Sequence, residues 1–283
     1  MRTRDRVLAA GPTALAGVLS ASLLALFVLP IVALVEFAGP GGIGREFGDP
    51  QFWSSLDVTL LASAIAVATA VCLGVPLGYL LARKHFPGKG LLRSLVLLPV
   101  VIPHLVAGLA LFLWVEPGSP VGRLATWAGL PLFDSVWAVV LVMVYVGAPY
   151  TVLASELAFR SVSDDALEAA RSLGAGRADA FIDVALPAAG RGILTGALLT
   201  WARGVSEIGA FLILAYAVYP AGPYAGPVTY PVSVYIYNLY GVNFHAAASA
   251  AALLVLLALA AFLAVRLVEG AGRLPWGRGE VGA

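Results

Sequence analysis

Residues 58–82 read VTLLASAIAVATAVCLGVPLGYLLA and contain no charged side chain. Asp57 and Arg83 bound this run, which is long enough for one helix to cross a hydrocarbon core that takes roughly 20 apolar residues. A bilayer interior offers no water to the backbone, so such a run predicts a helix, in which the backbone groups bond one another. The stretch therefore predicts an integral membrane protein.

The composition of the whole 283-residue chain has the same character. Only 12% of the residues are charged and 60% are hydrophobic, whereas about 25% are charged in a typical soluble domain. Lys and Arg total 17 and Asp and Glu total 16, a balance that gives no basic field for a nucleic acid. The single cysteine, Cys72, excludes a disulfide-stapled fold, and with three scattered histidines it does not supply a metal site.

The spacing of charges along the chain predicts an all-α protein with six transmembrane helices. The expected spans are 12–36, 57–82, 92–115, 135–157, 192–219 and 246–268. These continuous apolar runs disfavour a β-barrel, whose strands alternate in polarity. We expect a first helix and external loop in 1–56, a core transmembrane domain in 57–268 and a cytoplasmic tail in 269–283.

The distribution of Lys and Arg predicts the orientation of the spans. The expected cytoplasmic segments carry Arg2, Arg4, Arg6, Arg83, Lys84, Lys89, Arg93, Arg160, Arg171, Arg177, Arg191, Arg266, Arg273 and Arg278. The alternate loops carry only Arg45 and Arg123. The positive-inside rule therefore places both termini in the cytoplasm. The first apolar stretch is about twice as long as a signal-peptide core of 7–15 residues, so we expect it to be retained.

One cytoplasmic segment, residues 160–191, differs in composition from the rest. It reads RSVSDDALEAARSLGAGRADAFIDVALPAAGR. Ser163 and the two aspartates after it favour a helix start, and Asp165 with Glu168 resembles a capping box. Gly174 can end this helix in a left-handed conformation, and Pro187 marks the return to the membrane. We expect a short cytoplasmic helix whose alanines form a low surface suited to a groove on another protein.

The same segment resembles the EAA motif of permease subunits of ATP-binding-cassette importers. The matching residues are Glu168, Ala169, Ala170, Gly174, Val184, Leu186 and Pro187. The resemblance implies the fold of a type I importer permease, in which this segment is a coupling helix that docks into a cleft on an ATPase subunit. It implies that Glu168, Ala169, Ala170 and Gly174 make that contact.

Nucleotide-binding motifs do not accompany this segment. Gly88-Lys89-Gly90 lacks the hydroxyl and the upstream glycine of a P-loop. The run GPGGIG at 39–44 matches a dinucleotide fingerprint only formally, because no strand precedes it, and we expect a turn-rich external loop there. We therefore expect no catalytic residue and no cofactor on this chain, with ATP and Mg²⁺ bound by a separate ATPase.

Two further stretches are similar to permeases of molybdate and tungstate importers. They are LPVVIPH at 98–104, followed by VAG, and WARG at 201–204, followed by Ser206, Glu207, Gly209 and Ala210. Related sulfate permeases share parts of both. The resemblance covers about residues 57–268 and implies a multi-pass protein of a prokaryotic cell membrane. It also implies a homodimer that works with two cytoplasmic ATPases and an extracytoplasmic oxyanion-binding protein.

Three side chains within the spans are candidates for the transport path. Arg203 is the one embedded arginine, and Glu207 follows four residues later, where the two can pair on one helix face. Such a pair is either a self-neutralised lock between helices or part of a gate, since intramembrane charges are expensive. His104 follows Pro103 in the third span, where it is either a core histidine or a path residue.

Alternative functions remain open at this stage. The same architecture would also suit sulfate, phosphate or another small solute. An ion-coupled secondary carrier usually has titratable groups within its spans, and here Glu207 is the main one. A membrane enzyme or assembly factor would need a cluster of reactive side chains at one depth, and the sequence offers none.

Overall fold

The computed structural model describes residues 2–219 and 227–271; within them the side chains of 2–14, 177 and 265–271 are not described. The helices in chain order are α1 (Arg2–Phe47), α2 (Pro50–Arg83), α3 (Lys89–Val101), α4 (His104–Val115), α5 (Pro120–Trp127), α6 (Val136–Ser161), α7 (Asp164–Ser172), α8 (Arg177–Asp179), the π-helix η1 (Ala180–Ala185), α9 (Leu186–Val205), α10 (Phe211–Leu214), α11 (Val232–Val242) and α12 (Phe244–Ala271). Most of the predicted tail, 269–283, lies outside the described residues, as do residues 220–226.

The expected all-α membrane fold is confirmed. Five helical segments in the described part of the chain are long and apolar enough to cross a membrane: Leu15–Phe47, Pro50–Arg83, Val136–Ser161, Ala180–Val205 and Phe244–Ala264. Their number rises to six if the bent pair α3 and α4 counts as one span. The chain divides into two compact units, one of Met1–Phe52 with Ile236–Ala283 and the other of Trp53–Tyr235.

In the first unit α1 packs along α12. Phe37 lies against Phe244 with ring centroids 5.4 Å apart, and a Cβ on Gly42 would collide with Ser249. The GPGGIG run was expected as a loop, and this prediction is wrong. Its backbone is helical except at Gly39, where φ is 63° and ψ is 162°. Glycine adopts this conformation without a steric penalty, so α1 consists of two helices joined by a kink at Gly39.

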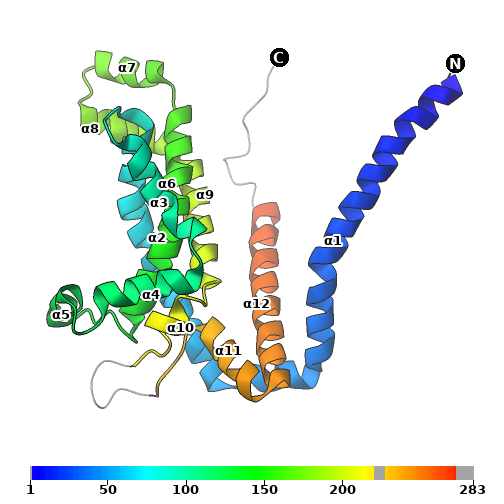
Figure 1. The fold of residues 1–283 in the computed structure, drawn as a ribbon. Helices are drawn as coiled ribbons and strands as arrows, with labels where there is room; N and C mark the ends of the chain where they lie inside the picture. Colours follow the sequence, from blue (N-terminus) through cyan, green and yellow to red (C-terminus); the bar gives the residue numbers. More distant parts are fainter. Residues whose placement is uncertain (1, 220–226, 272–283) are drawn as a thin grey trace. The chain divides into compact units, whose positions relative to one another are not determined.

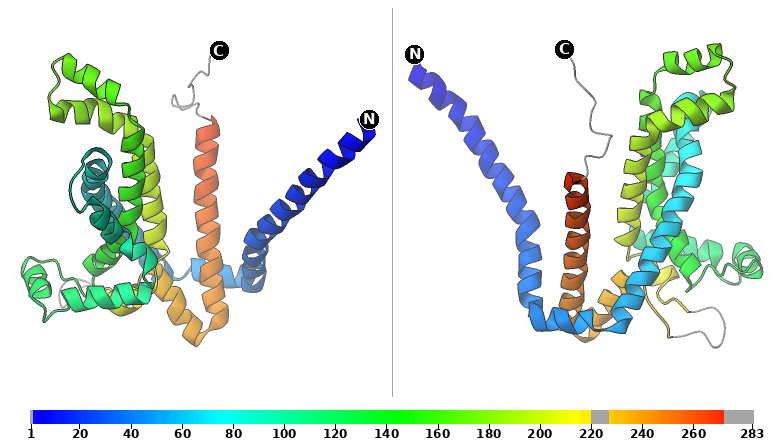
Figure 2. Two further views of the ribbon diagram at one scale, coloured as in Figure 1. Left: turned by 45° about the horizontal axis from the view of Figure 1, so that its top comes forward. Right: turned by 180° about the vertical axis from the view of Figure 1, so that it is seen from behind.

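In the second unit α6 and α9 pack closely against each other. Small residues allow this approach: a Cβ on Gly147 would lie 2.8 Å from the side chain of Thr200, and one on Gly196 would lie 2.9 Å from Thr151. The Thr151 and Thr200 hydroxyls are 2.7 Å apart, and the Thr200 hydroxyl donates to the Gly147 carbonyl at 2.7 Å. Such close contact is how helices associate in a membrane, where apolar burial gives little drive. Figures 1 and 2 show α7 and α8 at one end of α2, α6 and α9, with α4, α5 and α10 at the other.

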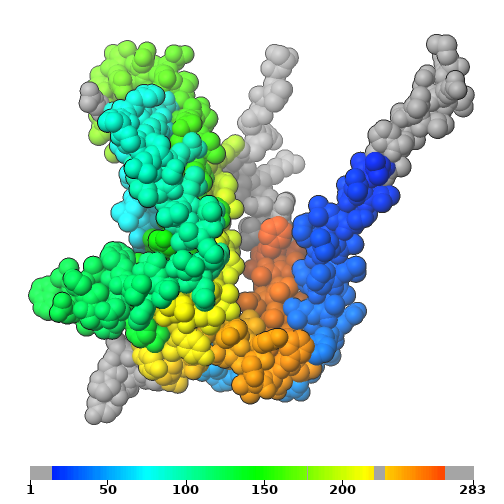
Figure 3. Space-filling model, in the orientation of Figure 1, coloured from blue at the N-terminus to red at the C-terminus, as the bar shows by residue number. Residues whose placement is uncertain are grey.

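The predicted third span, 92–115, is not one straight helix. It breaks at Ile102 and Pro103 into α3 and α4, which are bent by 114°. Ile102 is extended, with φ −72° and ψ 144°, as expected of a residue that precedes proline. Pro103 has no N–H to continue the helix. As a result, α4 and α5 form an arm that projects from the rest of the unit (Figure 3).

The predicted fifth span, 192–219, is displaced along the chain. The observed span starts at Ala180 with η1 and ends at Val205. Pro187 was expected to mark the return to the membrane, but the span begins seven residues earlier, at Ala180. Pro187 lies in the first turn of α9, directly after η1, where a missing N–H is tolerated. Beyond Ser206 the chain forms the short helix α10, and Val218 then pairs with Thr229.

Candidate functional site

The EAA segment forms a discrete helix, α7, as the sequence predicts. Its N-cap is Ser163, whose hydroxyl accepts a hydrogen bond from the Ala166 N–H at 3.1 Å. The capping box predicted at Asp165 and Glu168 is therefore wrong, because the helix starts two residues earlier. Asp164 and Asp165 occupy the first turn, where negative charge interacts favourably with the helix dipole.

Gly174 ends α7 in the left-handed conformation that the sequence predicts, with φ +94°. The Ala175 N–H donates to the Ala170 carbonyl at 3.1 Å, and the Gly174 N–H donates to the Arg171 carbonyl at 2.9 Å. These two bonds make a complete Schellman motif. The end of α7 is therefore fixed by backbone geometry at Gly174.

One residue anchors α7 to the rest of its unit. Leu167 is buried in an apolar cluster that includes Phe159 and Ala185, with Leu186 packed against it. Glu168 and Ala169 are exposed and Ala170 is half-buried. The Arg83 guanidinium adds a tie from the end of α2, because it contacts the Asp164 carboxylate and donates to the Val162 carbonyl. Glu168 and Ala169 are therefore exposed on one side of α7, while Leu167 packs the other side against the unit.

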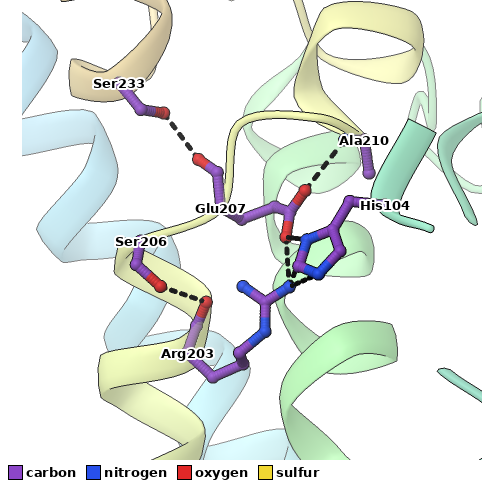
Figure 4. A network of polar contacts seen from close by, with 6 residues as sticks. All are labelled: His104, Arg203, Ser206, Glu207, Ala210 and Ser233. Carbon is purple, nitrogen blue, oxygen red and sulfur yellow. Dashed lines mark hydrogen bonds and ion pairs between the residues drawn. The ribbon is translucent and has the colours of Figure 1, made fainter. Parts of the chain in front are cut away.

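The other candidates meet at the opposite end of the unit, in one polar cluster (Figure 4). Arg203 donates to Glu207 Oε2 at 2.6 Å, so the predicted pairing is confirmed. His104 Nδ1 also lies 2.6 Å from Glu207 Oε2. The other carboxylate oxygen accepts from the Ala210 N–H at 2.9 Å, and the Ser233 hydroxyl donates to the Glu207 carbonyl at 2.6 Å. We call Arg203, Glu207 and His104 the junction triad.

Two glycines bring the elements of the junction triad into contact. A Cβ on Gly209 would lie 2.8 Å from His104 Cβ, and one on Gly108 would lie 2.7 Å from the Ala210 Cα. The start of α4 therefore packs directly on the chain that follows α9. The sequence motifs that contain these residues lie about a hundred positions apart, and the two helix breaks join them.

Exposure differs sharply within the triad. The side chain of Glu207 is 0% exposed, that of Arg203 is 17% exposed and that of His104 is 45% exposed. His104 is therefore not a buried core histidine within this chain. Arg203 Nη2 contacts both ring nitrogens of His104 and lies 2.8 Å from Nε2.

The sequence analysis missed a second buried carboxylate. Glu156 in α6 is 0% exposed; its Oε1 accepts from Arg160 Nη2 at 2.5 Å, and its Oε2 lies 3.4 Å from Arg93 Nε. The signal was present, since Arg160 follows Glu156 by four residues as Glu207 follows Arg203. Its position near a span boundary concealed it. Within the described residues, no group of three or more His, Cys, Asp or Glu side chains could hold a metal ion.

A family model described as the inner membrane component of binding-protein-dependent transport systems matches residues 74–271. This range contains the EAA helix and the whole junction triad. The chain belongs to this family. It is the membrane-spanning permease of an ATP-binding-cassette importer, and it is a multi-pass inner membrane protein.

Relatives of the permease carry more specific names. A probable molybdenum ABC transporter permease of Haloferax volcanii is 36% identical over 91% of this chain and 90% of its own length. The molybdate/tungstate permease WtpB of Thermococcus kodakarensis is 36% identical over 88% of this chain and 92% of its own. The molybdenum permease ModB of Escherichia coli K12 is 36% identical over 57% of this chain and 71% of its own.

Solved structures support the fold of the permease. A bacterial alginate ABC transporter in complex with an alginate-bound periplasmic protein has a chain that matches with a TM-score of 0.63 and 19% identity. The match covers 93% of this permease and 97% of that chain. This structural match shows that the two chains share a fold, and at 19% identity it does not identify the cargo.

Proposed function

We propose that this permease imports a tetrahedral oxyanion, molybdate or tungstate, delivered by an extracytoplasmic binding protein. The observation that carries the proposal is the similarity to permeases named for molybdate and tungstate, at 36% identity over about nine tenths of both chains. The polar cluster of Arg203 and His104 within the transmembrane unit supports an anionic cargo, because intramembrane ionisable groups generally serve a transport path.

The proposed assembly is a homodimer of this permease with two cytoplasmic ATPase subunits. ATP and Mg²⁺ bind to the ATPases, and this chain makes and breaks no covalent bond. Both termini and α7 face the cytoplasm, in accord with the bias of Lys and Arg. The exposed Glu168 and Ala169 then enter a cleft on the ATPase, with Gly174 fixing the end of the contact.

A continuous helical segment links the two ends of the permease. Helix α7 packs on η1 through the cluster of Leu167 and Ala185, and η1 leads without interruption into α9, which ends two residues after Arg203. A π-helical turn is a common site of adjustment within a helix. Closure of the ATPases would therefore displace α7, shift α9 through η1, and move Arg203 relative to α4.

Binding measurements on the partner protein test the cargo. We expect the extracytoplasmic protein encoded with this permease to bind tungstate and molybdate far more tightly than sulfate or phosphate in calorimetric titration. Preference for sulfate or phosphate would replace the proposed cargo and leave the importer family in place. Uptake into vesicles that contain the permease without the ATPase would instead indicate an ion-coupled carrier.

A further inference from the structure

In the second unit the bend between α3 and α4 lies where the span that includes α9 ends. Helix α4 begins at His104 after the 114° bend, and α9 ends at Val205. The Gly209 and Ala210 backbone packs on the first turns of α4, as the close approaches at Gly108 and Gly209 show. Interrupted helices within a membrane are tolerated where the freed backbone is buried in protein or lines a watery cavity, and their N-terminal ends favour anions.

In the junction triad the basic side chains are partly exposed and the acidic side chain is buried. Glu207 is fully buried, whereas part of the Arg203 guanidinium and nearly half of the His104 side chain are exposed. An exposed glutamate would repel an anion. Here the carboxylate faces inward and is bound by Arg203, His104 and the Ala210 N–H, so an approaching anion meets hydrogen-bond donors first.

Arg203 also retains free donors. An arginine has five N–H donors in a planar fork, and in the described part of the chain every polar contact of the Arg203 guanidinium goes through Nη2. The groups on Nε and Nη1 remain for another acceptor. In addition, no side chain caps the start of α4, and its first amide with a backbone partner is that of Ala107, which bonds the Pro103 carbonyl.

The depth of Arg203 also fits a site on a transport route. Gly204 packs on Met143, since a Cβ there would lie 3.2 Å from the methionine side chain. Met143 is seven residues from Val136, the first residue of α6, which at a rise of about 1.5 Å per residue puts it roughly 10 Å inside that end of the helix. A partly exposed arginine at such a depth faces water or another polar surface, because exposure to lipid would be costly.

We propose that Arg203 and the first turn of α4 form a transient binding site for the tetrahedral oxyanion on its way through the permease. This inference rests on the proposed function and names the residues that would carry it out. Nε and Nη1 of Arg203 and the free amides of α4 bind the anion, while Glu207 and His104 hold the guanidinium in place. His104 is a positioning residue in this scheme.

Replacing both Arg203 and Glu207 with neutral residues distinguishes an anion-binding site from a pair that only holds helices together. In Arg203→Gln/Glu207→Gln no charge is left unpaired and the two amides can bond each other. We expect the double variant to assemble with its ATPase and hydrolyse ATP, and to lose tungstate uptake by roughly tenfold or more, as for loss of a charged hydrogen-bond pair. Uptake equal to that of the wild type would overturn the proposal.

Thiol labelling gives a readout that does not depend on transport by the altered pair. Ser206 is exposed beside Arg203, and its hydroxyl donates to the Arg203 carbonyl at 3.1 Å. In a Cys72→Ser background, Ser206→Cys is nearly isosteric. We expect a water-soluble anionic thiol reagent to label it, and tungstate to slow this labelling severalfold when Arg203 is present. Leu198→Cys on the exposed face of α9 is the matched control and should show no such protection.

The outcomes test the proposed cargo and the proposed binding site separately. Wild-type complex that fails to take up tungstate or molybdate overturns the cargo, and the labelling is then repeated with the anion that the binding protein does take. Wild-type uptake of tungstate without protection of Ser206→Cys overturns the site alone. Protection that disappears in the double variant supports the site.

Discussion

Two buried glutamates, Glu156 and Glu207, lie near opposite ends of the same unit and have the same local design. Each is 0% exposed, and each pairs with an arginine four residues away in the sequence, Arg160 or Arg203. Met143, the neighbour of Gly204, and Glu156 are thirteen residues apart on α6, or about 20 Å at the helical rise. The two pairs therefore occupy different depths of the permease.

Their surroundings differ in how completely the carboxylate is satisfied. Both oxygens of Glu207 have hydrogen-bond partners, and the arginine beside it is only 17% exposed. Glu156 Oε2 has no hydrogen-bond partner, and Arg93 and Arg160 are 42% and 44% exposed. The Glu207 carboxylate is thus fully hydrogen-bonded beside a mostly buried arginine, whereas both arginines beside Glu156 are almost half exposed.

This difference indicates different roles. A buried carboxylate with both oxygens hydrogen-bonded fixes one geometry, which suits a junction where the start of α4 meets the end of α9. Glu156 lies on the uninterrupted helix α6, near α7, and its two arginines come from α3 and α6. An arrangement with solvated partners can exchange contacts at small cost, which suits the end that carries α7, the proposed coupling helix.

The largest effect is expected from Glu207→Gln alone. The change leaves Arg203 charged in a site where it has lost its counter-charge, and removing one partner of a buried ion pair typically costs about 3–5 kcal/mol. We expect a stability loss near the lower figure, because glutamine keeps an acceptor for the Ala210 N–H. Thermal unfolding of the purified complex measures it. An unchanged midpoint would show that Arg203 does not depend on Glu207.

Gly174→Val tests the coupling end by itself. Valine at φ +94° meets a steric penalty of about 1–2 kcal/mol, although no atom lies within 4 Å of the site. We expect the variant to assemble and to uncouple ATP hydrolysis from uptake, while the junction triad is unaffected. Gly190→Val in α9, where space is also open and φ is not positive, is the matched control. Normal stimulation of ATPase activity in Gly174→Val would contradict the assignment of α7.

A double-mutant cycle on Glu156→Gln and Arg160→Gln compares the two pairs directly. Because both arginines near Glu156 are almost half exposed, we expect a coupling energy of about 1 kcal/mol or less. The equivalent cycle on Arg203 and Glu207 should give a clearly larger value, since Glu207 is fully buried and Arg203 is only 17% exposed. Equal coupling energies would contradict the claim that the two ion pairs differ in strength.

The smallest effect concerns Asp134, a third carboxylate, which lies at the same end as the junction triad. Burial raises the pKa of Asp134 above its ordinary value of 3.8, against hydrogen bonds from the backbone of Ala217 and Tyr216 that lower it. A raised pKa means that the folded state binds the proton more tightly. This contribution to stability is present below pH 3.8 and is lost as the pH rises through the folded pKa.

The variant Asp134→Asn tests this sign. Asparagine stays neutral, tolerates the φ of 43° found at this position, and keeps an acceptor for the Ala217 N–H. We therefore expect the melting temperature of the variant minus that of the wild type to increase from about pH 4 to about pH 7. A difference that is constant or decreases over this range would contradict the effect of burial.

Local patterns in the sequence predict the coupling end well. A serine before two aspartates and a glycine after the alanine-rich turn define α7, and the observed N-cap and Schellman motif lie at Ser163 and Gly174. The pairing of Arg203 with Glu207 also follows from spacing alone. These features depend on residues within a few positions of one another, so a single sequence contains the information.

The junction could not be predicted in the same way. Hydropathy describes 92–115 and 192–219 as continuous spans, because each stretch is mostly apolar on both sides of its break. Whether Pro103 kinks a helix or ends it depends on what receives the freed backbone, and here the receiving surface is Gly209 and Ala210, more than a hundred residues later. The contact of His104 with Glu207 follows from this long-range packing.

The most direct test of the account is ATP-driven uptake of tungstate into vesicles that contain this permease with its ATPase and binding protein. We predict uptake that requires ATP and the binding protein, and that falls roughly tenfold or more in Arg203→Gln/Glu207→Gln while ATP hydrolysis continues. Tungstate uptake by the wild type without ATP, or undiminished uptake by the double variant, would contradict the account.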